Sequence, residues 1–284
     1  MINPMLDIGR VRSALRALEV RPTRAMGQNF LVDGQALAHI VAAGEVDTTT
    51  CVVEVGPGLG VLTWELVQRA AHVVAVELDK RLIARLRDEF RDATNLTLVN
   101  QDILRTDMAA LTGRRSYHVV ANLPYAITSP VLRHFLEATH PPEVMVVLVQ
   151  REVAQRICAE PGDMSVLAHA MQIRAIPDIV TIVPPESFMP VPAVHSAVLR
   201  LRRRPTPLVA PDEEAAVMRV LKAGFLHARK QLGNSLASGL ASHQIHITRE
   251  HAQTQLVAAG IDPVRRAETL TIAEWVALTR QLGY

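Results

Sequence analysis

Cysteine is scarce in this chain of 284 residues, which contains only Cys51 and Cys158. The two lie far apart and form no Cys-x-x-Cys pair, so the sequence predicts neither a disulfide framework nor a structural zinc site. We interpret both as small core residues of a protein in a reducing compartment, and we expect no metal cofactor.

Long apolar runs are also lacking. The longest strongly apolar stretch, Val144–Val149, is far too short to cross a bilayer. The N-terminal residues 1–12 include Asp7 and Arg10 and contain no long apolar stretch, unlike a signal peptide. We therefore expect a cytoplasmic, monomeric protein with no membrane partner.

Neither sign of charge dominates, and lysine is rare. The chain has 30 basic and 28 acidic residues, and its only lysines are Lys80, Lys222 and Lys230. Residues 1–30 carry a net charge of +3, residues 31–200 of −5 and residues 201–284 of +4. The arginine excess suits phosphate binding, although genome composition also explains it. Two basic segments around an acidic middle suit a cleft whose rims bind RNA phosphates, with an affinity that falls with salt.

From Cys51 onward, apolar runs alternate with helical stretches. Short β-branched runs separated by helix-length segments are typical of βαβ units around a parallel sheet covered on both faces. The predicted strands of this region are Cys51–Val55, His72–Glu77, Leu96–Val99, Tyr117–Ala121 and Val144–Val149. The predicted helices between them are Leu62–Ala70, Lys80–Phe90 and Ser129–Ala138.

The pattern differs on either side of this region. The apolar residues of the first 18 follow helical spacing with arginines off that stripe, and Asp33 is a candidate N-cap of a helix that ends near Gly44. Two later runs predict a closing antiparallel pair, Ile179–Val183 and Val194–Leu201. The last part predicts helices at Glu213–His227, Lys230–Leu240, Arg249–Ala259 and Ile272–Leu282. We expect an N-terminal basic segment 1–30, an α/β domain 31–201 and a helical domain 202–284.

A glycine-rich turn follows the first strand of the predicted sheet. Cys51–Val55 runs into Gly56-Pro57-Gly58-Leu59-Gly60. Such glycines let a ligand approach the backbone closely, although a turn of this kind alone is often structural. The dinucleotide fingerprint is G-x-G-x-x-G, and here the third glycine comes one residue early. This spacing, with Glu54 before it, resembles motif I of the class I S-adenosylmethionine (SAM)-dependent methyltransferases, which makes Gly56, Gly58 and Gly60 candidate cofactor-binding residues.

Acidic residues follow the next two strands. Glu77 can accept hydrogen bonds from both ribose hydroxyls, whereas Asp79 better fits a carboxylate at a helix N-terminus. Asp102 can accept from the exocyclic amine of the cofactor's adenine, or it is a solvated turn residue. Open α/β sheets bind ligands at the ends of their strands. We therefore interpret Glu77 and Asp102 as cofactor-binding residues.

The fourth strand ends in Asn122-Leu123-Pro124-Tyr125. A proline turn after a strand is often only structural, but its place in this sheet favours a catalytic role. It resembles the [Asn/Asp]-Pro-Pro-[Tyr/Phe] motif of methyltransferases that act on exocyclic amines of nucleobases. The N6 lone pair of adenine is delocalised, and the Asn122 side chain and the Leu123 carbonyl can hold its hydrogens out of plane. Tyr125, after the rigid Pro124, can stack on an adenine that has left its helix.

Phe188 is the second candidate for stacking. It lies in a proline-rich loop between the two closing strands, Pro184–Pro192. Flanking prolines would hold the ring as the wall opposite Tyr125. The alternative is that Phe188 anchors the loop in the core, as the usual burial of phenylalanine favours.

Six segments carry a wider resemblance: Arg24–Leu31, Glu54–Gly60, Asn122–Tyr125, Phe188–Ser196, Arg229–Leu236 and Gly260–Glu268. On these segments the chain resembles the KsgA/RsmA family of ribosomal RNA adenine dimethyltransferases along nearly its whole length. The resemblance implies that SAM donates methyl groups to N6 of two adjacent adenosines in the 3′-terminal hairpin of 16S rRNA. It also implies that the partner is an immature small ribosomal subunit.

The same resemblance implies roles for particular residues. Asn29 and Leu31 would bring the N-terminal segment over the cofactor, joining Asn122 as a cofactor-binding residue. Residues 31–201 would be the catalytic domain and residues 202–284 an RNA-binding domain. The candidate RNA-binding residues are Arg10, Arg12, Arg16, Arg24, Arg202, Arg203, Arg229 and Lys230. For Arg202 and Arg203 a solvated strand end is the alternative.

Three alternative functions stay open. Resistance methyltransferases that modify an adenosine of large-subunit (23S) rRNA share this catalytic layout, although Leu123 and the segment Gly260–Pro263 favour the small-subunit enzyme. A catalytically idle ribosome assembly factor would have no need of Glu77, Asp102 and Asn122. A nicotinamide-dependent oxidoreductase is disfavoured by the glycine spacing and by the turn after the fourth strand.

Overall fold

The computed structural model describes residues 3–18 and 29–284. Its strands are β1 (Phe30–Leu31), β2 (Cys51–Val55), β3 (His72–Glu77), β4 (Leu96–Asn100), β5 (Tyr117–Asn122), β6 (Val144–Gln150), β7 (Ala175–Val183), β8 (Phe188–Met189) and β9 (Ser196–Arg203). Its α-helices are α1 (Ile8–Ala17), α2 (Gly34–Ala43), α3 (Val61–Val67), α4 (Lys80–Glu89), α5 (Met108–Thr112), α6 (Thr128–Leu136), α7 (Arg151–Ile157), α8 (Val166–Gln172), α9 (Glu214–Phe225), α10 (Leu232–Ala241), α11 (Arg249–Ala258) and α12 (Ile272–Gln281). Short 3-10 turns are η1 (Pro4–Leu6), η2 (Ile103–Arg105), η3 (Tyr125–Ile127), η4 (Pro185–Ser187) and η5 (Ala267–Thr269).

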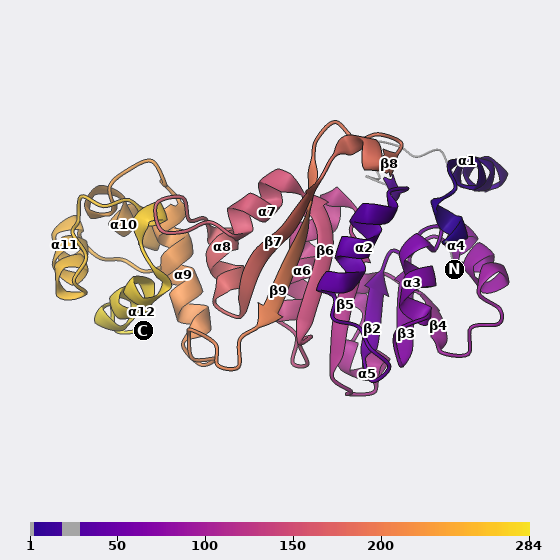
Figure 1. The fold of residues 1–284 in the computed structure, drawn as a ribbon. Helices are drawn as coiled ribbons and strands as arrows, with labels where there is room; N and C mark the ends of the chain where they lie inside the picture. Colours follow the sequence, from indigo (N-terminus) through magenta and orange to yellow (C-terminus); the bar gives the residue numbers. More distant parts are fainter. Residues whose placement is uncertain (1–2, 19–28) are drawn as a thin grey trace. The chain divides into compact units, whose positions relative to one another are not determined.

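One large sheet carries the α/β part of the fold (Figure 1). Among the described residues it has seven strands in the order β4-β3-β2-β5-β6-β9-β7. Neighbours from β4 through β6 pair in parallel, whereas β9 runs antiparallel to β6. The mostly parallel sheet predicted from the sequence is therefore confirmed. Because the chain turns from one half of the sheet to the other between β2 and β5, ligands are expected at the carboxyl ends of these two strands.

The central strands are buried because both faces of the sheet are covered. All five residues of β2 are buried, as the continuous apolar run from Cys51 requires. One face packs against α2 and α3, where Ile40 and Leu66 meet Val52 and Val120 in a single apolar cluster. This core fixes the carboxyl ends of β2, β3 and β5, from which the site is built.

Element boundaries differ from the prediction where polar residues continue a strand. β9 extends to Arg203, because Arg202 still pairs with Val144 of β6. β7 begins at Ala175, four residues before the expected start, and includes Pro177. Because β7 is at the end of the sheet order, it is an edge strand, where proline costs no ladder hydrogen bond. The predicted helix from Asp33 to Gly44 is confirmed, with the Asp33 side chain accepting from the first backbone N–H groups of α2.

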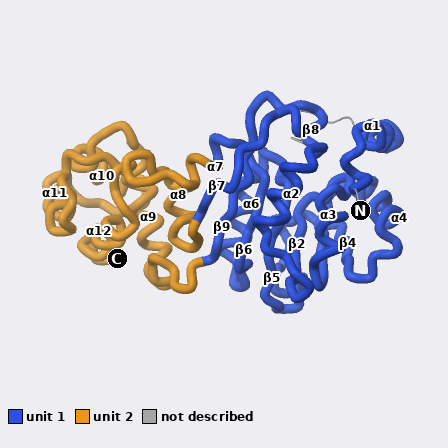
Figure 2. Tube along the Cα trace, in the orientation of Figure 1, with its two compact units in different colours: residues 1–154, 177–203 blue, residues 155–176, 204–284 orange. Residues whose placement is uncertain are grey.

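The chain forms two compact units (Figure 2). One comprises Met1–Ala154 and Pro177–Arg203, the other Gln155–Ile176 and Arg204–Tyr284. The sequence places residues 155–176 in the α/β domain, whereas in the structure Ile173 packs into the core of the helical unit, around the buried Trp275. In the helical unit α9 and α10 pack closely, since a Cβ at Gly239 would lie 2.0 Å from the carbonyl oxygen of Ala223.

Candidate active site

The glycine loop after β2 is held by contacts that exclude side chains. Gly58 has φ of +58° and Gly60 has φ of +89°, the left-handed region that favours glycine. A Cβ at Gly60 would lie 2.6 Å from the ring of Phe90, and a Cβ at Gly58 would lie 3.2 Å from the ring of Phe30. The two glycines therefore let the loop pass between two aromatic rings. Gly60 borders neither of the two cavities described below, and its close neighbours Phe90 and Leu86 pack the loop on α4; cofactor binding by Gly60 stays a prediction.

Two adjoining cavities lie along the carboxyl ends of β2, β3 and β5. The smaller, of about 90 Å³, is lined by Met5, Val11, Asn29, Phe30, Leu31, Glu54, Gly56, Pro57, Gly58, Leu59, Val61, Leu62, Glu77, Asn122, Leu123, Pro124 and Tyr125. The larger, of about 460 Å³, is lined by Val55, Gly56, Val76, Glu77, Leu78, Asp79, Gln101, Asp102, Ile103, Pro124, Ala126 and Ile127. Gly56, Glu77 and Pro124 border both. Two of the predicted catalytic or cofactor residues, Gly60 and Phe188, border neither.

Glu54 is a carboxyl group buried in the wall of the smaller cavity. It is 1% exposed, and its Oε2 accepts a hydrogen bond of 2.7 Å from the hydroxyl of Thr63. Burial raises the pKa of Glu54 to about 8, the hydrogen bond from Thr63 lowers it, and the charge of Glu77 raises it further. At neutral pH Glu54 is therefore protonated. The sequence marks Glu54 only as part of the glycine motif, although a charged residue inside the apolar strand Cys51–Val55 indicates a special environment.

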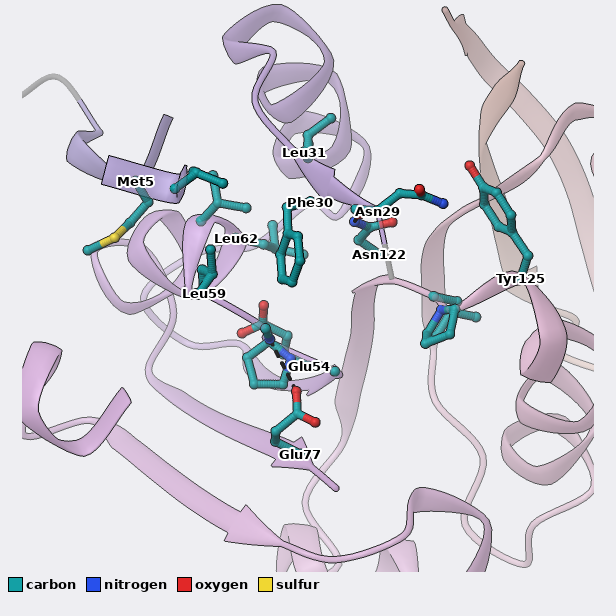
Figure 3. A pocket seen from close by; sticks show the side chains of 17 residues that line it. Met5, Asn29, Phe30, Leu31, Glu54, Leu59, Leu62, Glu77, Asn122 and Tyr125 are labelled. Atoms are coloured by element: carbon teal, nitrogen blue, oxygen red, sulfur yellow. Dashed lines mark hydrogen bonds between the residues drawn. The ribbon is translucent and has the colours of Figure 1, made fainter. Parts of the chain in front are cut away.

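Glu77 is positioned by backbone N–H groups. Its Oε2 accepts from Gly58 N at 3.2 Å and its Oε1 from Asp79 N at 3.0 Å. The residue is 7% exposed; burial raises the pKa of its carboxyl, and the backbone hydrogen bonds oppose that rise. Figure 3 shows Glu54 and Glu77 near one another, with the bond from the glycine loop dashed. Each carboxylate oxygen can accept a second hydrogen bond, so Glu77 can still bind a pair of hydroxyls.

Asp102 borders the larger cavity together with apolar side chains. Its Oδ1 accepts from Leu104 N at 3.0 Å and so caps η2, and Arg105 lies 3.8 Å from its Oδ2. The turn role that the sequence left open is thus present in the structure. Ile103 and Ile127 border the same cavity, and so do the polar residues Glu77, Asp79 and Gln101. Apolar walls with a few polar groups suit a flat heterocycle.

Asn122 ends β5, and its orientation is fixed by the segment before α2. Its Nδ2 donates a hydrogen bond of 3.0 Å to the backbone carbonyl of Asn29, and Figure 3 shows the two residues side by side. Because the amide nitrogen is used in this way, the side-chain oxygen is the group that Asn122 can offer to a hydrogen-bond donor. The sequence predicted both residues for the site but not this contact.

The two predicted stacking residues lie in different environments. Tyr125 borders the smaller cavity, and burial raises the pKa of its phenol, so the hydroxyl stays protonated at neutral pH. Phe188 is 2% exposed and belongs to the apolar cluster under α2, where β8 pairs Phe188 with Leu31 of β1. The structure therefore favours the alternative in which Phe188 anchors its loop, and that anchoring holds Leu31 at the cavity.

The predicted RNA-binding residues fall into two groups. Arg10, Arg202 and Arg203 form ion pairs with Glu89, Glu45 and Glu143, respectively. Arg12, Arg16, Arg229 and Lys230 are exposed, and Arg24 lies outside the described residues. The second group has the greater capacity to bind phosphate, since the pairs in the first group already neutralise part of the charge.

Other kinds of site are not seen in the described part of the chain. Across residues 3–18 and 29–284, His, Cys, Asp and Glu side chains nowhere gather in threes as a metal site would need. The helices within the same ranges are all too short or too polar to cross a membrane.

The sheet order, the glycine loop after β2 and the acidic residue at the end of β3 define the fold of a class I methyltransferase. Two solved structures share this fold. The 23S rRNA methyltransferase ErmE is 29% identical with a TM-score of 0.68, over 90% of this chain and 100% of that one. A dimethyladenosine transferase from Plasmodium falciparum has a TM-score of 0.73 and 22% identity, over 88% of this chain and 95% of that one.

The sequence also matches the ribosomal RNA adenine dimethylase family over residues 21–278. It is 41% identical to ribosomal RNA small subunit methyltransferase A of Lactiplantibacillus plantarum, over 99% of this chain and 98% of the relative. It is 40% identical to the protein of the same name from Dehalococcoides mccartyi, over 95% of this chain and 92% of the relative. The chain belongs to the ribosomal RNA adenine dimethylase family, and the resemblance drawn from its motifs is confirmed.

Proposed function

We propose that this protein transfers methyl groups from SAM to N6 of two adjacent adenosines in the 3′-terminal hairpin of 16S rRNA, giving N6,N6-dimethyladenosines. The observation that carries the proposal is the orientation of Asn122, whose amide nitrogen is bonded to Asn29 and whose oxygen is left for an amine. The choice of rRNA is supported by the names of the relatives. They are called small-subunit methyltransferases, and the matches cover nearly their whole length.

The cavities fit SAM by their chemistry. Glu77 offers a buried carboxylate to the ribose hydroxyls, and Asp102 offers an acceptor to the adenine amine in the larger cavity. Gly56 and Gly58 line the smaller cavity with bare backbone, beneath Asn29 and Leu31. The larger cavity, at about 460 Å³, has the volume of a small-molecule site. When bound there, SAM supplies an electrophilic methyl group.

The protein's own residues act on the adenine amine. In the first transfer the side-chain oxygen of Asn122 and the carbonyl of Leu123 accept the two N6 hydrogens, which holds them out of the ring plane and builds negative potential at nitrogen. In the second transfer they accept the one hydrogen that remains, and in each transfer the methylated nitrogen releases one proton to solvent. This is preorganisation of acceptors rather than removal of a proton by a base. Tyr125 supplies the stacking surface that a base outside its helix requires. Leu123 is 1% exposed, so its side chain is packed in the interior and supports the turn after β5.

The partner we propose is an immature small ribosomal subunit, modified in the cytoplasm by a monomer that needs no metal. Residues 1–30 would cover the cofactor, and the α/β unit would carry the chemistry. The helical unit would bind RNA phosphates through the exposed Arg229 and Lys230, and the α/β unit would bind them through Arg12 and Arg16 of α1. Binding of this kind weakens steeply as salt rises.

The test measures methyl transfer to small subunits and, in separate reactions, to large subunits, both from a strain that lacks the gene. Wild-type protein and the variants Asn122→Ala and Asn95→Ala are incubated with SAM, and both rRNAs are digested and analysed by mass spectrometry. Asn95 is the matched control, because it is also a half-buried amide that donates to backbone carbonyls and lines neither cavity.

We expect dimethyladenosine in 16S rRNA with wild type and Asn95→Ala, and none with Asn122→Ala. Equal turnover by Asn122→Ala and the control would refute the proposed role of the amide. Modification confined to 23S rRNA would instead establish the large-subunit alternative. No methyl transfer to either RNA, together with no SAM binding in calorimetry, would point to an assembly factor.

A further inference from the structure

The hydroxyl groups of Tyr125 and Ser196 share a hydrogen bond with 2.6 Å between their oxygens. The two residues are 71 positions apart in the sequence. Ser196 is the first residue of β9 and is 0% exposed, whereas Tyr125 is half-buried in η3. A buried hydroxyl without a partner is costly, so the bond constrains the side chains at both of its ends.

This bond spans the carboxyl end of β6. Asn122 at the end of β5 is paired with Leu148 of β6, and Ser196 is paired with Gln150 of the same strand. β5 and β9 are therefore two strand spacings apart, roughly 9–10 Å. Tyrosine is long enough to cover most of that distance. The contact ties the turn after β5 to the start of β9.

The aromatic ring of Tyr125 is consequently held at two points. On its backbone side Pro124 precedes the residue with φ of −57°, which proline's ring enforces. At its far end the hydroxyl is held by Ser196. Of the two rings predicted to hold the base, Tyr125 borders the cavity and Phe188 does not. Figure 3 shows Tyr125 beyond Asn122, on one side of the cavity.

We propose that Ser196 is a positioning residue, which holds the ring of Tyr125 in the orientation that stacks on the target adenine. This inference rests on the proposed function, since it names how the site receives its base. The preorganised ring spares the cost of ordering an aromatic side chain when the base enters. The phosphate contacts that we propose for subunit binding do not involve this ring, so the effect of its orientation falls on the steps after binding.

The test is a double-mutant cycle with Ser196→Ala, Tyr125→Phe and the double variant. Each single variant should lower kcat by roughly 2- to 13-fold, which corresponds to an ordering cost of about 0.5–1.5 kcal/mol at 1.36 kcal/mol per tenfold. The KM for small subunits and the Kd for SAM should stay within about twofold of wild type. The double variant should be no slower than the slower single variant, because Ser196 acts only through the phenol. Thr112→Ala, which removes another buried hydroxyl outside both cavities, should keep wild-type kcat.

Tyrosine NMR provides a readout that a merely structural role would not give. The chain has three tyrosines, Tyr117, Tyr125 and Tyr284, so ring-labelled protein gives three assignable signals. In Ser196→Ala only the signal of Tyr125 should move. Movement of the Tyr117 signal as well would overturn the inference, because it would show a general loss of packing.

The kinetic outcomes separate this inference from the function on which it rests. Wild-type kcat in Ser196→Ala, or a further loss in the double variant, would overturn the positioning role alone. Absence of methyl transfer by the wild-type protein would overturn the proposed function and this inference with it. If Ser196→Ala does not fold, Tyr125→Phe still tests the same bond from its other end.

Discussion

Replacing Glu54 by glutamine should abolish a pH dependence of stability that one buried carboxyl produces. Glu54 is fully buried and accepts a hydrogen bond from Thr63, and burial raises its pKa from the ordinary 4.5 to about 8. Glutamine has the same shape and can accept the same hydrogen bond, but it cannot ionise. The substitution therefore removes the ionisation of this side chain while it keeps the packing and the hydrogen bond.

The sign follows from where the proton is bound. Between pH 4.5 and 8 the folded protein holds a proton on Glu54 that the unfolded chain has released. The stability that the folded state gains from the proton on Glu54 is therefore fully present below pH 4.5, and it is lost as pH rises through 8. One proton changes the free energy of unfolding by about 1.36 kcal/mol per pH unit. Between pH 5.5 and 7.5 the wild type should thus lose about 2.7 kcal/mol that Glu54→Gln retains.

The assay is urea unfolding followed by circular dichroism at pH 5.5, 6.5 and 7.5. Other titrating groups are common to both proteins, so they cancel in the difference between wild type and Glu54→Gln. For each unit by which the pH rises, the free energy of unfolding of Glu54→Gln should increase by about 1.4 kcal/mol relative to that of the wild type. Glu152→Gln, which changes an exposed glutamate on α7, should run parallel to the wild type. A difference between wild type and Glu54→Gln that stays constant over this range would refute the reasoning.

Three further substitutions test the packing and the cofactor site. Gly60→Ala should lower the free energy of unfolding by roughly 2–4 kcal/mol in urea unfolding, because a Cβ there meets an aromatic ring at 2.6 Å. The control Gly113→Ala, at a glycine with φ of +61° and open space around it, should cost only about 1 kcal/mol. Equal losses in the two variants would contradict the clash at Gly60. Gly239→Ala should make the helical unit sensitive to limited proteolysis, because its Cβ would lie 2.0 Å from the carbonyl oxygen of Ala223; wild-type resistance would disprove the close packing. Glu77→Gln should weaken SAM binding about tenfold in calorimetry, as the loss of a charged acceptor does, and an unchanged Kd would remove Glu77 from the cofactor site.

The strands and the acceptors at their ends could be predicted because each depends on local sequence. The β-branched run Cys51–Val55 and its glycine turn specify a buried strand followed by a loop. Glu77 and Asn122 follow from the rule that parallel strands end at one edge of the sheet. Contacts with distant segments refine the orientation of Glu77 and Asn122, but they do not change the fact that both residues lie at this edge.

Contacts between distant segments could not be predicted in the same way. The sequence favours Phe188 as a stacking wall over a core anchor, whereas its burial and its pairing with Leu31 favour the anchor. The start of β7 differs from the prediction, and local sequence does not indicate it: Pro177 is unfavourable in a strand unless that strand lies at an edge, which is a property of the whole sheet. Residues 155–176 carry no local sign that they pack with the helical unit.

The residue at position 122 shows why an amide suits this site better than a carboxylate. The Nδ2 group of Asn122 donates to the carbonyl of Asn29, and a carboxylate in its place would set two acceptor oxygens against each other at 3.0 Å. The same bond fixes which end of the amide faces an incoming amine. The Asn29–Leu31 segment therefore has two roles in this arrangement: it lines the smaller cavity, and through Asn29 it orients the acceptor that we propose for the base.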